Sequence, residues 1–277
     1  MNWRRGAWSG RAALETLDFG LPRMAMLFGL VLVPWLALGF IGLRLSGEIG
    51  LGVLRMVLQL GLIGVYLKTL FTLNDPWLNG LWILAMLVVA DLAILRRAGL
   101  RRRVFFGATF VAVALSVLFS AAYLILLVIR PPLPYDAHYL IPLTGMILGN
   151  CLQGNVIALE RFFAALRDNE DEYLTYLLLG ASRWEAARPY FREAVKAAIN
   201  PTLASMATMG LVSLPGMMTG QILGGAEPWI AVKYQIAIML CIFASTTLAA
   251  LLNLKLGMNL AFTEFDVLRE DWSGNRS

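Results

Sequence analysis

Long apolar blocks separated by short polar segments dominate this chain of 277 residues. A helix needs about 20 consecutive apolar residues to cross the hydrocarbon core of a bilayer. Four blocks reach that length without a charged residue, and three more reach it with polar residues inside them. The pattern predicts an all-α, polytopic membrane bundle of about seven transmembrane helices, at residues 24–43, 49–71, 77–95, 104–129, 139–159, 199–223 and 232–254.

The composition supports a membrane protein, because 59% of the residues are hydrophobic and only 15% are charged, against about 25% charged in globular domains. We expect one membrane domain at 24–259, with no soluble domain large enough to fold alone. An N-terminal extension at 1–23 precedes it, a polar loop at 160–196 interrupts it, and a tail at 260–277 follows it.

Arginine and lysine positions orient the spans, because cytoplasmic loops carry the excess of positive charge. The arginines at 96–103, the loop at 160–196 and the C-terminus are then expected on the cytoplasmic side. The expected location of the protein is the cell (inner) membrane. The basic extension at 1–23 conflicts with seven crossings. Either it lies along the membrane surface as an amphipathic segment, or the first span does not cross fully.

The loop at 160–196 contains a predicted helix-turn-helix. Gly180 follows an apolar run, where a left-handed residue ends a helix at little steric cost. Ser182 and Glu185 have the spacing of a capping box, which starts a new helix. We interpret the loop as a docking site for a partner, with Trp184 as its anchor; a solvated surface hairpin is the alternative. The candidate docking residues are Glu172, Gly180, Ala181, Ser182, Arg183, Trp184, Glu185 and Arg188.

The predicted span at 199–223 has glycines every four residues, at Gly216, Gly220 and Gly224. They share one helix face and would let another backbone approach closely, while Pro215 would kink the helix before that face. A kink beside a glycine face is typical of a helix that lines a moving pathway, and equally of tight packing. Met217 and Met218 lie on the same helix, where thioethers suit copper(I) or serve as adaptable packing.

Polar residues inside the other spans are costly and therefore candidates for function. Arg55 and Gln59 share a helix face, and Asp91 would neutralise Arg55 if their spans meet. Either these polar groups line a route or they form interhelical hydrogen bonds, and Arg55 also suits snorkelling to the interface. The candidate pathway or packing residues are Arg55, Gln59, Asn150, Gln153, Asn155, Pro215, Gly216, Met217, Met218, Gly220 and Gln221.

Several chemistries find no support in the sequence. No glycine-rich phosphate loop ends in Gly-Lys-Ser/Thr, so this chain does not hydrolyse ATP by that route. The single histidine, His138, and two separated cysteines, Cys151 and Cys241, offer no metal-ligand cluster. We find no catalytic acid–base pair, so we expect no enzyme. The basic balance follows from topology and gives no support to nucleic-acid binding.

Five segments resemble one family: RMVLQLGLIGVYLKTLF at 55–71, IPLTGMILGN at 141–150, LGAS at 179–182, GLVSLPGMMTGQILGG at 210–225 and KYQI at 233–236. They resemble the FetB-like (YbbM-like) family of ABC-transporter permeases. A bacterial member of that family is the membrane subunit of a proposed iron exporter, and the family is similar to plant membrane subunits linked to aluminium tolerance.

The resemblance implies a permease that exports iron or another metal. It also implies a separate cytoplasmic ATPase that binds ATP-Mg, no cofactor on this chain, and a homodimer of the permease in the bilayer. Gly180, Ala181 and Ser182 match the core of the coupling loop of importer permeases. The glutamate of that loop is displaced to Glu172, and Arg192 and Glu193 replace its downstream Leu-Pro.

Three rival functions stay open at this point. One is an ABC exporter of a nucleotide-sugar or another organic anion. The second is a secondary transporter without an ATPase, which would depend on an ion gradient. The third is an integral membrane enzyme, which would turn over a substrate alone.

Overall fold

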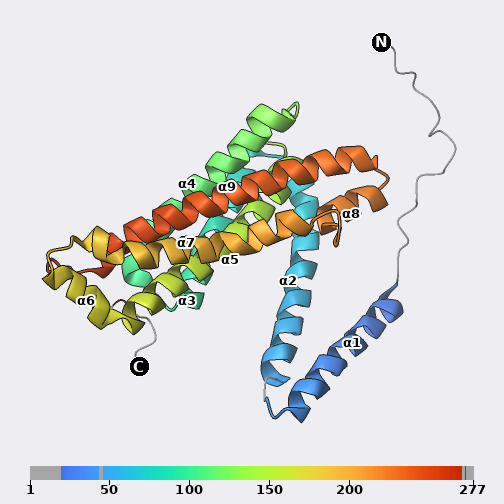
Figure 1. Ribbon diagram of the computed structural model, residues 1–277. Coiled ribbons are helices and arrows are strands. Elements are labelled where there is room, and N and C mark those ends of the chain that lie inside the picture. The colour runs from blue at the N-terminus through green and yellow to red at the C-terminus, as the bar shows by residue number, and fades with distance from the viewer. Residues whose placement is uncertain (1–19, 44–45, 270–271, 273–277) are drawn as a thin grey trace.

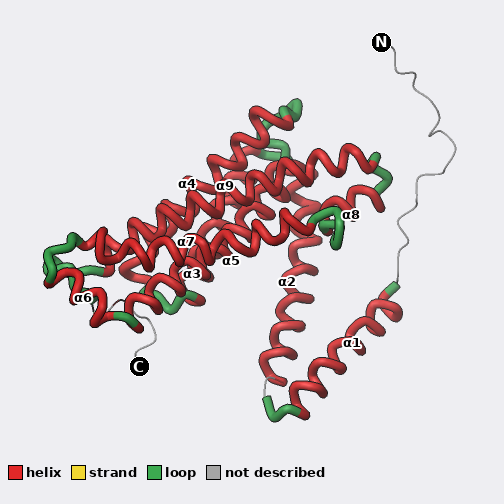
Figure 2. The backbone as a smooth tube through the Cα atoms, in the orientation of Figure 1, coloured by secondary structure: helices red, strands yellow, loops and turns green. Residues whose placement is uncertain are grey.

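The computed structural model describes residues 20–43, 46–269 and 272. Helices joined by loops make up this part of the chain, and it holds no β-strand (Figure 2). The all-α prediction is therefore confirmed. The elements are α1 (Leu21–Phe40), α2 (Ser46–Leu73), α3 (Pro76–Arg97), α4 (Arg102–Ala122), the π-helix η1 (Tyr123–Ile129), α5 (Ala137–Asp168), α6 (Glu170–Leu178), α7 (Arg183–Thr208), α8 (Gly216–Leu223) and α9 (Pro228–Ala261).

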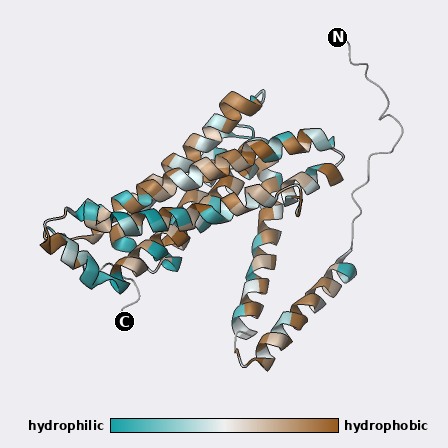
Figure 3. Ribbon diagram, viewed as in Figure 1, coloured by the Kyte–Doolittle hydropathy of each residue, from teal (hydrophilic) through white to brown (hydrophobic). Residues whose placement is uncertain are grey.

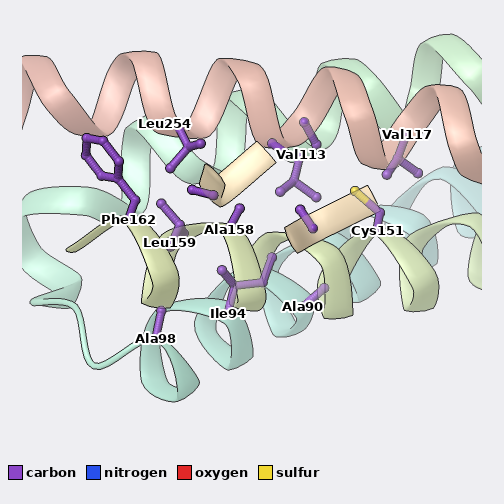
Figure 4. Close-up of a cluster of buried hydrophobic side chains, with 14 of the residues drawn as sticks. Ala90, Ile94, Ala98, Val113, Val117, Cys151, Ala158, Leu159, Phe162 and Leu254 are labelled. Carbon is purple, nitrogen blue, oxygen red and sulfur yellow. The ribbon is translucent and has the colours of Figure 1, made fainter. Parts of the chain in front are cut away.

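Helices α3, α4, α5, α7 and α9 form an elongated bundle around one apolar core (Figure 1). Figure 4 shows how Ile94 of α3, Val113 of α4, Phe162 of α5 and Leu254 of α9 converge there. Each of these side chains is at most 1% exposed. The core therefore contains side chains from helices that begin at Pro76 and end at Ala261. Their packing fixes how these helices lie against one another.

Side-chain caps determine where two of these helices begin. Asp75 precedes α3 and accepts hydrogen bonds from the backbone N–H groups of Trp77 and Leu78, at 2.9 and 3.0 Å. Asp136 precedes α5 and accepts one from the N–H of His138 at 3.0 Å. These carboxylates satisfy donors that have no partner within the helix. The hydrogen bonds to His138 also lower the pKa of Asp136.

Helices α1 and α2 form an arm that leaves the bundle (Figure 1). Only the C-terminal part of α2 packs on it, where the Tyr66 and Trp82 rings lie 4.3 Å apart and Leu70 is fully buried. The rest of the arm is apolar nearly all round (Figure 3), and none of its most hydropathic window is buried. A helix that is apolar on every face and unburied is suited to contact with lipid.

Six helices of the described chain are long and apolar enough to cross a membrane: α1, α2, α3, α4 with η1, α5 and α9. They correspond to six of the seven predicted spans. The prediction was wrong in one respect, because 199–223 is not one helix. Instead α7 continues through Thr208, residues 209–215 leave the helix, and α8 begins at Gly216. Both α7 and α8 pack on α9.

The break has a local cause. Proline disfavours helical backbone at the residue before it and has no N–H to donate, and Pro215 is the N-cap of α8. Gly210 has a left-handed φ of +83° and closes the turn that ends α7. The kink expected at Pro215 is therefore a complete interruption. Most of the predicted extension at 1–23 lies outside the described residues, and α1 begins at Leu21.

The close helix contact expected at Gly216 and Gly220 is not present, because a Cβ atom built on either would meet nothing within 4 Å. The close contact lies at Gly154 on α5. A Cβ there would overlap the methyl group of Thr246 on α9 and lie 3.3 Å from the carbonyl oxygen of Ala198 on α7. Glycine at this position lets three helices meet.

Candidate functional site

A pocket of about 290 Å³ opens where α5, α7, α8 and α9 meet, next to Gly154. Its lining includes Gly216 and Met217 of α8 but no residue of α6, and these two helices lie at opposite ends of the bundle (Figure 1). Two of its walls come from the middle of α5 and the C-terminal half of α7. Pro215 and Gly216 close a third side, so the interruption between α7 and α8 forms part of the wall.

Neutral polar and sulfur groups give the pocket its chemistry. No acidic, basic or histidine side chain lines it. The Oε1 atom of Gln235, on a side chain that is 5% exposed, has no hydrogen-bond partner among the described residues. A buried amide oxygen without a hydrogen-bond partner destabilises the fold. Because Gln235 lines the pocket, a bound ligand could interact with this oxygen. The polar and sulfur-bearing lining residues are Asn150, Gln153, Gln235, Thr202, Ser205, Met146, Met209, Met217 and Met239.

The pocket brings together five of the eleven predicted pathway or packing residues: Asn150, Gln153, Pro215, Gly216 and Met217. Met218, Gly220 and Gln221 belong to α8 but do not line it. Asn155 is fully buried behind it and ties α5 to α9, because its Oδ1 accepts a hydrogen bond of 2.5 Å from Asn253. For Asn155, the interhelical alternative is the one that the structure supports.

The predicted pairing of Arg55 with Asp91 does not form. Arg55 and Gln59 are exposed on the arm, far along α2 from the part that packs on the bundle. Asp91 is fully buried in α3, and the geometry gives neither carboxylate oxygen a close partner among the described residues. Thr109 of α4 is its polar neighbour. The prediction failed because α2 diverges from α3 beyond their shared end.

Sequence reasoning missed several lining residues, chiefly Gln235 and Met239 of α9 and Met146 of α5. Nothing in the local spacing of these residues predicts that they meet, and the packing of α9 against α5 brings them to the same place. Gln235 carried the clearest signal, since it is an amide inside a predicted span. The KYQI segment at 233–236 includes it.

The predicted helix-turn-helix is present at the other end of the bundle. Helix α6 ends at Leu178, and Gly180 follows with a φ of +92°. The Ser182 hydroxyl accepts from the N–H of Glu185, and a Glu185 carboxylate oxygen accepts from the N–H of Ser182 at 2.9 Å. This is the capping box expected from the sequence, and its hydrogen bonds lower the pKa of Glu185. We call residues 170–192 the hairpin.

Glu172 holds the two arms of the hairpin together. Its carboxylate accepts hydrogen bonds from the phenol of Tyr176 on α6, at 3.2 Å, and from that of Tyr190 on α7, at 3.1 Å. The hydrogen bond from Tyr176 to the Glu172 carboxylate raises the pKa of Tyr176. The glutamate that departs from the importer pattern therefore has a structural role, because it fixes the angle between α6 and α7.

The C-terminal segment at 262–269 braces the hairpin. Arg183, the first residue of α7, forms an ion pair with Asp266 and lies over the ring of Phe262, 5.5 Å from its centroid. The Tyr173 hydroxyl of α6 donates to the carbonyl oxygen of Asp266 at 2.8 Å. Burial and the Asp266 carboxylate raise the pKa of Tyr173 to about 12, so this phenol stays a donor at neutral pH.

The tip of the hairpin exposes apolar side chains. Leu178 and Leu179 are 88% and 80% exposed, whereas Trp184 is 46% exposed and packs edge-on against Phe191 with ring centroids 5.1 Å apart. The predicted anchor Trp184 is thus partly occupied within the chain. The two leucines are the more available apolar groups, and sequence reasoning had taken them only as the end of a helix.

Comparison with known proteins decides the family. The profile described as "Uncharacterised protein family (UPF0014)" matches residues 21–262, which include every helix from α1 to α9. The chain belongs to UPF0014. The resemblance found in the sequence is thereby confirmed, and the chain is a multi-pass membrane protein.

UPF0014 relatives match over most of their length. A UPF0014 membrane protein of Synechocystis is 39% identical over 76% of this chain and 81% of its own length. The Arabidopsis thaliana protein ALUMINUM SENSITIVE 3 is 33% identical over 80% of each chain. The Escherichia coli protein named "Probable iron export permease protein FetB" is 30% identical over 76% of this chain and 80% of its own. No solved structure matches this chain.

In this UPF0014 protein one helix joins the hairpin to the pocket. Helix α7 starts at the capping box and supplies Ala198, Pro201, Thr202 and Ser205 to the pocket wall. Its 26 residues correspond to about 39 Å at 1.5 Å per residue. A displacement of the hairpin would therefore reach the pocket through a single element.

Proposed function

We propose that this chain is the permease subunit of an exporter driven by a separate cytoplasmic ATPase, with the pocket as its cargo site and the hairpin as its docking site. The observation that carries the proposal is the continuity of α7. A helix whose first residue is braced in the hairpin and whose last turns line the pocket can transmit movement from one to the other. Coupling requires such an element with two arrangements.

The orientation follows from charge. The arginines at 96–103 lie at the same end of the bundle as the hairpin and the segment at 262–269, because Arg97 and Arg167 line one hollow with Trp272 and the hairpin contacts Asp266. This end is cytoplasmic by the positive-inside rule. The C-terminus is then cytoplasmic, and we propose the cell (inner) membrane as the location. Leu178 and Leu179 then face the cytosol, where exposed apolar side chains call for a protein partner.

The cargo chemistry favours a metal over an organic anion. The pocket has no arginine, lysine or histidine to balance a phosphate or carboxylate, so a nucleotide-sugar would lose its hydration without a counter-charge. Iron is the metal in the name of the Escherichia coli relative, so it is tested beside a softer metal ion that suits the thioethers of the pocket. Because two ATPases need two docking sites, we propose that two permease copies act together.

The first experiment asks whether an adjacent gene encodes an ATPase and whether that ATPase copurifies with the chain, and then reconstitutes both in vesicles. ATP-driven loss of loaded metal that needs both proteins would support the proposal. Full transport by this chain alone, without ATP, would contradict it and favour a secondary transporter.

Variants locate the docking site. L178S combined with L179S should abolish copurification, because it removes the two most exposed apolar groups of the hairpin. Trp184→Ala should weaken it less, since that ring packs on Phe191. Leu211→Ser is the matched control, because Leu211 is 89% exposed at the opposite end of α7. Equal effects at both ends would contradict docking at the hairpin.

A further inference from the structure

We infer that the pocket binds a soft monovalent cation of the copper(I) and silver(I) class through methionine thioethers. Its role as a cargo site rests on the proposed function, whereas the binding itself does not. Nothing in the names of the relatives points to this class of ion; the donor set of the pocket does.

Methionine is concentrated at the pocket. Four of its sixteen lining residues are methionine, against 12 of 277 in the chain. They come from four places in the fold: Met146 from α5, Met209 from the end of α7, Met217 from α8 and Met239 from α9. Unbranched, flexible thioether side chains can turn toward a shared centre.

The lining lacks the anionic and imidazole donors that hard divalent metal ions prefer. The lining holds no carboxylate, imidazole or thiol, and the described residues contain no group of three or more such side chains that could hold a metal. Iron(II) and manganese(II) prefer anionic oxygen or imidazole ligands, whereas thioethers select copper(I). A single positive charge, shared by soft neutral donors, is also easier to desolvate within a bilayer than a double charge.

Size and polarity agree with a small cargo. The volume of about 290 Å³ lies just below the roughly 300 to 1,000 Å³ of pockets for drug-sized ligands. The unpartnered Oε1 of Gln235 offers one further neutral donor on the pocket side of α9. A cation would supply the partner that this buried oxygen lacks.

The interruption between α7 and α8 gives this site a way to change affinity. Met209 caps the end of α7, and Met217 lies in the first turn of α8. A shift of α7 relative to α8 changes the separation of these two thioethers. An ion bound by both would be held in one arrangement and released in the other, which is the differential affinity that transport needs.

Silver(I) titration of the purified full chain, labelled with ¹³C at the methionine methyl groups, tests the inference without any ATPase. Silver(I) is the probe because it stays monovalent. The methyl resonances of Met146, Met209, Met217 and Met239 should shift within one equivalent, while that of Met258 stays in place. Met258 is the internal control, since it is 5% exposed in α9 and does not line the pocket. Unmoved pocket resonances, or an equal shift of the 75% exposed Met26, would overturn the inference.

Substitutions make the test quantitative. M209L combined with M217L should weaken silver(I) binding by at least about ten-fold, as the loss of ligand support does in metal sites, whereas Met258→Leu should not change it. Iron(II) and manganese(II) should leave the pocket resonances unmoved. If silver(I) does not bind but the ATPase still drives export of another cargo, this inference fails and the proposed function stands. If silver(I) binds and no ATPase pairs with the chain, the proposed function fails and this inference stands.

Discussion

Arg183 and Asp266 form an ion pair between the first residue of α7 and the segment that follows α9. The same guanidinium lies over the Phe262 ring, and the carbonyl group of Asp266 accepts a hydrogen bond from Tyr173. Three parts of the chain therefore meet at one carboxylate-bearing residue. The start of α7 is fixed by the C-terminal segment as well as by its own cap.

Asp266→Asn should loosen the hairpin, because it removes the charge partner of Arg183 while keeping the size of the side chain. We expect faster hydrogen exchange at the backbone amides of 173–186 and little change in α5. Asp168→Asn is the matched control, since Asp168 is exposed and forms an ion pair with its neighbour Arg167. Unchanged exchange in Asp266→Asn would show that the Tyr173 and Phe262 contacts are sufficient.

Gly154→Ala should destabilise the bundle by roughly 1–3 kcal/mol, the usual cost of overpacking a core. The added methyl group meets the stiff, β-branched Thr246 and the carbonyl oxygen of Ala198. Gly149→Ala, on the same helix with nothing within 4 Å, is the control. Thermal unfolding in detergent measures both.

Thr246→Ser removes the methyl group that the new Cβ would overlap and keeps the hydroxyl. The double variant of Gly154→Ala with Thr246→Ser should therefore recover part of the lost stability. No recovery would place the clash at Ala198 instead.

The contrast between Gly154 and Gly216 shows what the sequence could predict. The four-residue glycine spacing of α8 is a visible pattern, yet those glycines meet no other backbone. Gly154 stands alone in the sequence, and its importance arises only where α5, α7 and α9 cross. A periodic pattern reports one helix face, but it does not say which helix will cover that face.

Local signals were the reliable ones. Ser182, Glu185 and Gly180 interact within four or five residues of each other, so their spacing predicted the turn and the cap correctly. Six of the seven predicted spans correspond to long apolar helices, because length and hydropathy are also local properties of the sequence. The pocket combines α5 with α9, about 80 residues apart in the chain at Gln153 and Gln235, and no local pattern predicts that pairing. Pro215 was recognised as a disruption, but its full effect depended on Gly210 as well.

Acid should weaken the capping box. The hydrogen bonds with Ser182 hold the pKa of Glu185 below its usual 4.5, so this carboxylate stabilises the folded hairpin above the unfolded pKa. That contribution is lost as the pH falls through the lowered pKa of the folded state. The first amides of α7 should therefore lose protection from hydrogen exchange as the pH is lowered from about 4.5.

Glu185→Gln is the control for the acid effect, because the amide does not titrate in this range. Ser182→Ala should remove the cap at every pH, at a cost of about 1 kcal/mol. Protection that falls equally in Glu185→Gln would assign the acid effect to another group.

Asn155→Ala and Asn253→Ala should each destabilise the contact of α5 with α9, since either leaves a fully buried amide without its partner. The double variant should lose less than the sum of the two, by the coupling energy of their hydrogen bond. Such bonds between membrane helices contribute about 0.6 kcal/mol on average and up to about 1.7 kcal/mol. A double-mutant cycle by thermal unfolding measures it, and strict additivity would mean that the bond adds no stability.

The arm of α1 and α2 meets the bundle at the C-terminal part of α2, where Tyr66 lies against Trp82 and Phe71 stacks on His138. Because internal packing does not hold the rest of the arm, its inclination is set by how well its apolar length fits the surrounding lipid. Thinner or thicker bilayers would therefore swing α1 about that joint, while the helices behind it keep their shape. The inclination of the arm of α1 and α2 would therefore report the thickness of the surrounding membrane.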